Sequence, residues 1–80
     1  MEKNHYKTSD LSIASYLLST GKSTLTGTEK EGRDVIFLFT PQEKAEELVR
    51  LYWADQAPTI QPRQLFQSLR SLKDLIFSGG

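Results

Sequence analysis

The 80-residue chain contains no cysteine, which excludes disulfide-stapled folds, thiolate zinc sites and cysteine nucleophiles. Packing alone must therefore hold its core. No apolar run approaches the roughly 18 residues of a membrane-spanning helix, and residues 1–10 are mostly polar. We predict a cytoplasmic protein with neither a secretion signal nor a membrane anchor.

An excess of either charge is also missing, because ten Lys and Arg residues balance ten Asp and Glu residues. No overall field draws such a chain to nucleic acid or anionic lipid, so nucleic-acid binding would require a local basic patch. Apolar residues make up 38% and charged residues 25%, the balance of a folded chain. We predict one small domain over 1–80, with an ordered core of about 5–77 and a frayed tail at 78–80.

A first helix is predicted over 9–20. Thr8, Ser9 and Asp10 offer short side-chain oxygens to the free amides of a helix start. Apolar residues then recur at steps of three and four, and Gly21 follows where a left-handed cap is favoured.

A β-hairpin is predicted to follow, with arms 23–30 and 33–40 joined by a turn at Glu31-Gly32. The first arm is polar and rich in threonine, as edge strands often are. The second arm alternates apolar residues on both faces, with Ile36 and Leu38 opposite to Val35, Phe37 and Phe39. We therefore expect it to be a central strand with apolar cover on both faces.

A central strand needs a neighbour on each side, so we predict that residues 5–8 pair with the free edge of 35–39. The strand order is then first, third, second, with the first and second strands parallel. The alternative is that the free edge pairs with a second chain in a dimer.

Two more helices are predicted after the hairpin. Thr40-Pro41-Gln42-Glu43 matches a capping box, which predicts a helix over 41–54. A loop over 55–61 contains Pro58, and Pro62 begins a helix that extends to about 77. The fold is therefore an α+β domain of order βαββαα, whose three-stranded sheet, centred on 33–40, packs against helices. The first helix on one face and the other two on the opposite face would cover both sides of the sheet.

Catalytic and metal-binding patterns are missing. His5 is the one histidine, so no second histidine is available to activate a serine or share a metal. Glu43, Glu46 and Glu47 are accounted for by capping and solvation of a helix. The segment 21–24 resembles the end of a phosphate-binding loop, but Tyr16 stands where that loop requires a glycine.

Two groups of exposed residues are candidates for binding. Tyr52 and Trp53, at the end of the second helix, are candidate anchors for a protein partner. Basic and amide side chains that could contact nucleic acid form the second group: Arg50, Arg63, Gln67, Arg70 and Lys73. Helical spacing places Arg63, Gln67 and Arg70 on one face.

Five segments together resemble a known family: 6–11, 14–18, the hairpin, 48–53 and 70–76. Over residues 6–77 the chain resembles the small bacterial domain of unknown function numbered 5659, whose members are single-domain proteins of about this length from bacterial, mobile-element or phage-like genomes. The resemblance implies a bacterial or mobile-element setting and supplies no functional residue.

The sequence lacks catalytic and metal-binding patterns but contains aromatic residues that could anchor a partner. This combination favours a non-enzymatic interaction or adaptor protein that needs no cofactor. We expect its partner to be a protein or a second copy in a homodimer, bound through Tyr52 and Trp53 or through the helix at 62–77, with no role for a membrane. The alternative is a nucleic-acid-binding accessory factor that uses the basic group.

Overall fold

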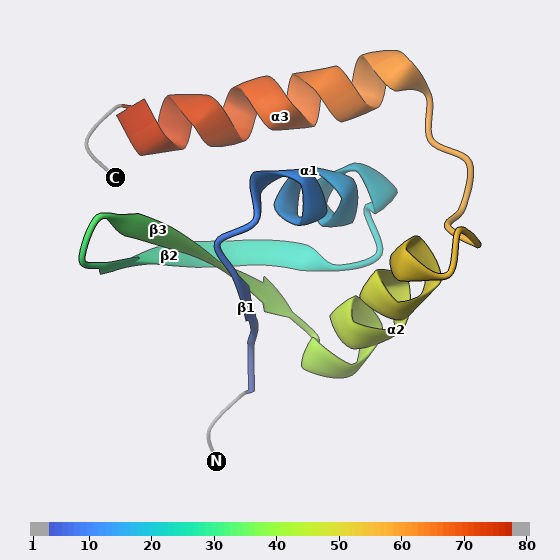
Figure 1. The fold of residues 1–80 in the computed structure, drawn as a ribbon, viewed down its shortest axis with the longest axis horizontal. Coiled ribbons are helices and arrows are strands. Elements are labelled where there is room, and N and C mark those ends of the chain that lie inside the picture. The colour runs from blue at the N-terminus through green and yellow to red at the C-terminus, as the bar shows by residue number, and fades with distance from the viewer. Residues whose placement is uncertain (1–3, 78–80) are drawn as a thin grey trace.

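The computed structural model describes residues 4–77, and within them the chain forms three strands and three helices. In chain order they are β1 (Tyr6–Thr8), α1 (Leu11–Thr20), β2 (Thr24–Glu31), β3 (Asp34–Thr40), α2 (Gln42–Trp53) and α3 (Pro62–Phe77). This is the α+β order βαββαα that the sequence predicts (Figure 1). The tail predicted to fray, 78–80, lies outside the described residues.

The sheet has the predicted order, with β3 between β1 and β2 and antiparallel to both. Tyr6 and Leu25 flank Phe39 from the two sides, so all three side chains point to one face. The hairpin turns at Gly32, whose φ of 62° is the left-handed conformation that glycine adopts without strain. A bulge between Leu25 and Gly27 shifts the register of β2.

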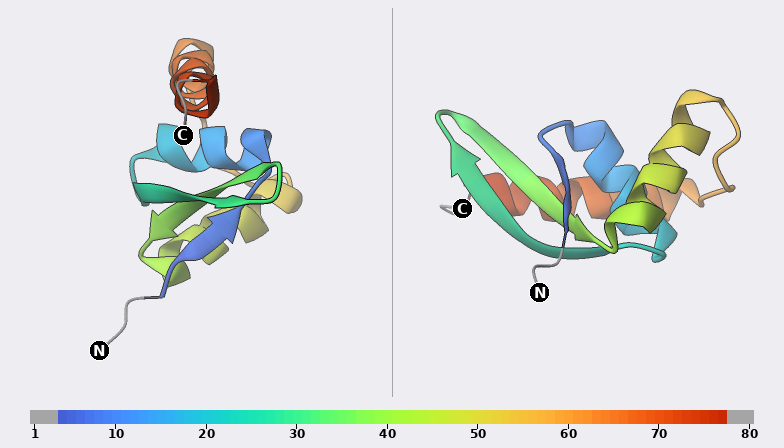
Figure 2. Two further views of the ribbon diagram at one scale, coloured as in Figure 1. Left: turned by 90° about the vertical axis from the view of Figure 1, so that its left-hand side faces the viewer. Right: turned by 90° about the horizontal axis from the view of Figure 1, so that it is seen from below.

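Helix α1 is covered on more than one side. It begins where the Asp10 carboxylate accepts hydrogen bonds from the Ser12 and Ile13 amides at 2.9 and 3.2 Å. It ends at Gly21, with a φ of 69°. All five residues from 13 to 17 are buried, because α1 lies between the sheet and α3 (Figures 1 and 2).

The helices are arranged differently from the prediction that α2 and α3 share one face of the sheet. Helix α3 packs along α1, whereas α2 lies near the end of β3 and contacts β1, β3 and α1 (Figures 1 and 2). Ala45 and Leu48 of α2 join Phe37 and Phe39 in the same core as α1. The prediction was wrong because α1 has apolar groups on several sides, and α3 covers the side that the sheet leaves open.

The expected apolar cover of both faces of β3 is also wrong. Ile36 and Leu38 point away from the helices and remain partly exposed, outside the core that Phe37 and Phe39 enter. On this face Lys7 lies opposite Leu38 and Glu29 lies opposite Ile36. The side chains of Lys7 and Glu29 form an ion pair across β3, with Lys7 Nζ and Glu29 Oε1 3.5 Å apart. The aliphatic part of a lysine can shield neighbouring apolar side chains in this way.

Helix α2 starts one residue later than the capping box predicted. Pro41, not Thr40, occupies the N-cap position, and no side chain caps the helix. Thr40 remains in β3 opposite Thr24, and its carbonyl accepts a hydrogen bond from Ser23 Oγ at 3.3 Å. The Thr40–Pro41 peptide bond is cis. Pairing in the sheet therefore competes successfully with the local capping signal.

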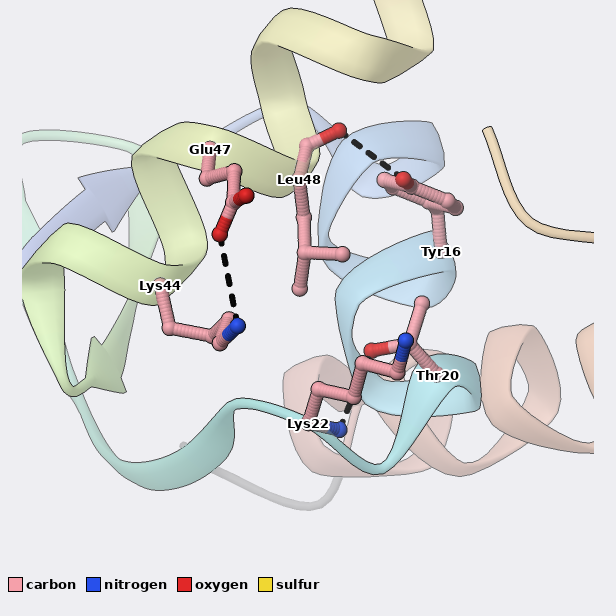
Figure 3. A network of polar contacts seen from close by, with 6 residues as sticks. All are labelled: Tyr16, Thr20, Lys22, Lys44, Glu47 and Leu48. Atoms are coloured by element: carbon pink, nitrogen blue, oxygen red, sulfur yellow. Dashed lines mark hydrogen bonds and ion pairs between the residues drawn. The ribbon is translucent and has the colours of Figure 1, made fainter. Parts of the chain in front are cut away.

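A buried hydrogen bond fixes α2 against α1. The Tyr16 hydroxyl donates to the Leu48 carbonyl at 2.8 Å (Figure 3). Burial raises the pKa of Tyr16 above its ordinary value, because the phenolate would lose its hydration. The pKa of Tyr6 is raised as well, first by burial and then by the charges of Glu46 and Asp10.

We predict that Leu72→Ala destabilises the domain by about 2–5 kcal/mol, because Leu72 is fully buried where α3 meets the core. Leu75→Ala, on the same helix at a position 41% exposed, should cost well under half as much. Urea unfolding followed by circular dichroism measures both variants. Equal losses of stability would show that α3 is not anchored through Leu72.

We predict that Tyr16→Phe lowers the free energy of unfolding by about 0.5–1.5 kcal/mol near neutral pH, because the bond to Leu48 is lost. The raised pKa of Tyr16 adds a pH dependence. Above about pH 10, tyrosine ionises more readily in the unfolded chain, so stability falls as pH rises. Tyr16→Phe should reduce this alkaline loss.

Urea midpoints at about pH 7 and about pH 11 test both effects. Tyr52→Phe is the control, since no hydrogen bond of its hydroxyl is found among residues 4–77. An alkaline loss unchanged by Tyr16→Phe would contradict the assignment.

Candidate functional site

An apolar groove lies where α1, the end of α2, the 54–61 segment and the first half of α3 meet, and we name it the α1–α3 groove. Its volume is about 450 Å³, within the roughly 300–1,000 Å³ typical of ligand-binding clefts. It is lined by Ser12, Ser15, Tyr16, Tyr52, Ala57, Pro58, Ile60, Leu65, Phe66 and Leu69. None of these described lining residues carries a charge, so the groove is suited to hold an apolar group.

The first wall of the groove comes from α1. Ser12, Ser15 and Tyr16 follow helical steps of three and four, so they share the side that faces the groove. The Tyr16 hydroxyl is already bonded to the Leu48 carbonyl, which leaves its ring for contact. Ser15 is 2% exposed, and its Oγ has no hydrogen-bond partner among the described residues. A buried hydroxyl without a partner costs about 1–3 kcal/mol.

Aromatic rings at the end of α2 extend this wall. The Tyr52 ring lies 5.1 Å from the Tyr16 ring at an interplanar angle of 42°. The Trp53 ring meets Tyr52 edge-on, at 5.1 Å and 87°. Tyr52 is half-buried in the groove, whereas Trp53 is 69% exposed outside it. The three rings form a series from the interior to the surface.

The segment between α2 and α3 closes one end of the groove. Helix α2 ends at Trp53. Two residues later, Asp55 adopts a left-handed φ of 59° and donates its amide to the Tyr52 carbonyl at 3.2 Å. Aspartate tolerates this conformation better than most residues. The turn directs the chain across to α3, so that Pro58 and Ile60 reach the groove.

The opposite wall comes from α3. Leu65, Phe66 and Leu69 recur at steps of one, three and four on the side of α3 that borders the groove. Phe66 is 63% exposed and forms the outer edge of this wall. The groove therefore has one exposed ring in its lining, Phe66, and a second exposed ring, Trp53, next to its lining residue Tyr52.

A polar contact lies beside the groove, between the same two helices. Ser19 Oγ is 2.9 Å from Ser68 Oγ and donates to the Ser15 carbonyl at 2.8 Å. Gln67 lines a second hollow of about 310 Å³ beside Ser19 and Ser68. These hydroxyls fix α3 along α1 and thereby fix the width of the groove.

The sequence predicted two separate candidate binding regions, Tyr52 with Trp53 and the helix α3. The structure brings Tyr52 and α3 together, since both line one groove. The basic candidates are divided. Arg63, Gln67, Arg70 and Lys73 are all exposed on α3, whereas Arg50 is exposed on α2, which lies across α1 from α3 (Figure 1). Arg50 therefore does not extend the basic face of α3.

Sequence reasoning missed Ser15, Phe66 and Leu69 as groove residues. Leu11 to Thr20 contains no charged residue, and this was the available signal that α1 is covered on several sides. Phe66 and Leu69 read equally well as core positions of α3, and only the placement of α3 on α1 distinguishes the two roles.

Other kinds of site are not assembled in the described part of the chain. Over residues 4–77, no three His, Cys, Asp or Glu side chains gather as metal ligands would. No helix within that range is long and apolar enough to cross a bilayer. Glu43 borders a shallow hollow with Asn4 and Pro41, and Glu46 and Glu47 are not among its lining residues.

Comparison with known protein families identifies a match over nearly the whole chain. The family model "Domain of unknown function (DUF5659)" matches residues 3–78, a range that includes every strand and helix described above. No curated protein and no solved structure matches the chain. Because the model matches nearly the whole chain, this protein belongs to the DUF5659 family.

Proposed function

We propose that this protein is a small non-enzymatic interaction module that binds another polypeptide in the α1–α3 groove. The observation that carries the proposal is an apolar groove whose lining includes Phe66, 63% exposed, and whose neighbouring hollow is lined by Trp53, 69% exposed. Tryptophan and tyrosine dominate the energetics of protein interfaces, and exposed apolar patches commonly mark such surfaces.

A binding partner would also increase the stability of this small domain. An 80-residue chain has one modest core, which at this size supplies only about 3–5 kcal/mol of net stability. A partner that binds only the folded form adds to this. The proposal includes a second copy of the chain as a partner, and it places the protein in the cytoplasm of a bacterial or mobile-element system.

Peptide selection tests the groove as a polypeptide-binding site. Displayed random peptides are selected on the wild-type protein, and enriched sequences are assayed against Leu69→Gln, which makes one wall of the groove polar. We expect peptides with large apolar anchors, whose affinity falls about tenfold or more with Leu69→Gln because an apolar contact is lost. Leu75→Gln, the same change on the same helix outside the groove, should leave affinity within about twofold.

No enriched peptide family, or peptides that bind both variants equally, would refute the proposal. Circular dichroism of each variant first establishes that it is folded.

A second candidate function, nucleic-acid binding, is favoured by the outer face of α3. This helix carries three exposed cations, Arg63, Arg70 and Lys73, against one acid, Asp74, although the whole chain has no net charge. Two exposed phenylalanines, Phe66 at 63% and Phe77 at 82%, lie on the same helix. Cations interleaved with aromatic rings can contact phosphates and stack on bases.

Fluorescence anisotropy with short labelled single and double strands at about 50 mM salt tests this candidate. If it is correct, binding weakens steeply with salt, and a variant with both Arg70→Gln and Lys73→Gln loses affinity and has a shallower salt dependence. Arg33→Gln, at the exposed hairpin turn, is the control. Absence of wild-type binding rejects the candidate and leaves the groove proposal intact.

A further inference from the structure

The buried Ser15 hydroxyl gives the α1–α3 groove a chemical preference. Ser15 lies in the groove wall, and its Oγ has no partner among the described residues. The atom is closed off from solvent in this structure, so contact with a bound group requires the serine side chain to turn about χ1 to another staggered position. A hydroxyl can then donate or accept one hydrogen bond.

An indole matches this site. It offers a large apolar surface to the rings and leucines of the groove, and it carries one N–H donor that Ser15 Oγ can accept. A charged side chain would lose its hydration without gaining an opposite charge, because none of the described lining residues is charged. The volume of about 450 Å³ is near the lower end for ligand clefts, as expected for one bicyclic ring with part of its flanking chain.

The chain has one tryptophan, and its indole lies just outside the groove. Trp53 is 69% exposed, and no hydrogen bond of its Nε1 is found within residues 4–77. It lines a neighbouring hollow that shares Tyr52 and Ala57 with the groove. Its ring meets the Tyr52 ring edge-on at 5.1 Å, and Tyr52 also lines the groove, so the Trp53 indole lies next to the groove without entering it.

We propose that the α1–α3 groove receives the Trp53 side chain of a second copy, and that the two copies exchange their tryptophans reciprocally about a two-fold axis at the groove's edge. This inference rests on the proposed function, because it names the partner and the anchor of that same groove. A two-fold interface requires a surface that carries both the anchor and its receptor side by side, and Trp53 beside the groove provides both.

The exchange forms a weak dimer. Two indoles and their immediate surroundings bury less than the roughly 1,200 Å² at the lower end of stable complexes. The association is therefore transient, and it should be measured at about 0.1–1 mM protein, where contacts of millimolar to micromolar affinity are populated. The matching hydrogen bond to Ser15 gives it specificity for indole over a purely apolar ring.

Complementation of two defective variants tests the exchange. Trp53→Ala keeps the groove and lacks the anchor, whereas Leu69→Gln keeps the anchor and impairs the groove. In sedimentation equilibrium we expect wild type to dimerise and each variant alone to be monomeric at the same concentration. The mixture keeps one Trp53–groove contact where wild type has two, so it binds more weakly. We therefore expect excess Leu69→Gln to shift the groove resonances of isotope-labelled Trp53→Ala in NMR spectra, rather than to give a dimer in sedimentation. Leu75→Gln should dimerise like wild type. If Leu69→Gln does not fold, Phe66→Lys impairs the same groove from an exposed position.

A monomeric wild type at about 1 mM, dimerisation that persists in Trp53→Ala, or a labelled Trp53→Ala whose groove resonances do not shift with excess Leu69→Gln would each overturn the exchange.

Small indole probes separate this inference from the proposed function. In NMR titrations, indole should shift groove resonances. Wild type should prefer indole over 1-methylindole, because only indole has the N–H, and this preference should be about fivefold smaller in Ser15→Ala. Ser12→Ala, an exposed serine of the same groove, should retain the preference. Saturable indole binding without self-association overturns the second-copy partner and leaves the groove as a binding site. If the protein binds neither indole nor peptides and does not self-associate, both proposals are overturned.

Discussion

Burial of α1 on both its sheet side and its α3 side is the constraint on which the rest of the structure depends. Phe37 and Phe39 project from the central strand into one side of this helix, and Leu72 of α3 packs on the core from the far side. Five consecutive buried residues, 13–17, are the result. Charged side chains are almost never fully buried unless they are paired, and among the three helices of residues 4–77 only α1 has no charged residue.

The layering of sheet, α1 and α3 also produces the groove. Helix α2 contacts the same core through Ala45 and Leu48 and is fixed to α1 by the Tyr16–Leu48 hydrogen bond. The chain must then travel from the end of α2 around α1 to α3, and the 54–61 segment makes this crossing (Figure 1). The space enclosed between this crossing and the two helices is the groove. The fold and the candidate site therefore have one structural cause.

Three parts of the exposed surface differ in chemical character. On the outer face of the sheet, Lys7 and Glu29 pair across the partly exposed Ile36 and Leu38, which limits access to that apolar face. The outer face of α3 is basic with two phenylalanines. The α1–α3 groove is apolar and contains a hydroxyl without a partner. Among the surfaces of residues 4–77, the groove alone combines concave shape, an aromatic lining and a hydroxyl without a partner, which is why we give it the leading role.

Local signals in the sequence determined the elements themselves. Asp10 and Gly21 bound α1, the Gly32 turn sets the hairpin, and Pro62 begins α3, since capping and turn chemistry act over a few residues. The alternating apolar residues of 35–39 also identified the central strand and the strand order.

The tertiary structure alone decided which surfaces meet. Alternation in β3 could not reveal that Ile36 and Leu38 would be crossed by an ion pair from two other strands rather than covered by a helix. The capping box at Thr40 was overridden because that residue's backbone pairs in the sheet. The groove joins residues up to 57 positions apart, from Ser12 to Leu69, so no local pattern encodes it. Periodicity predicts that a side of a helix is apolar, but only the packing of the whole chain determines whether that side enters the core or borders a groove.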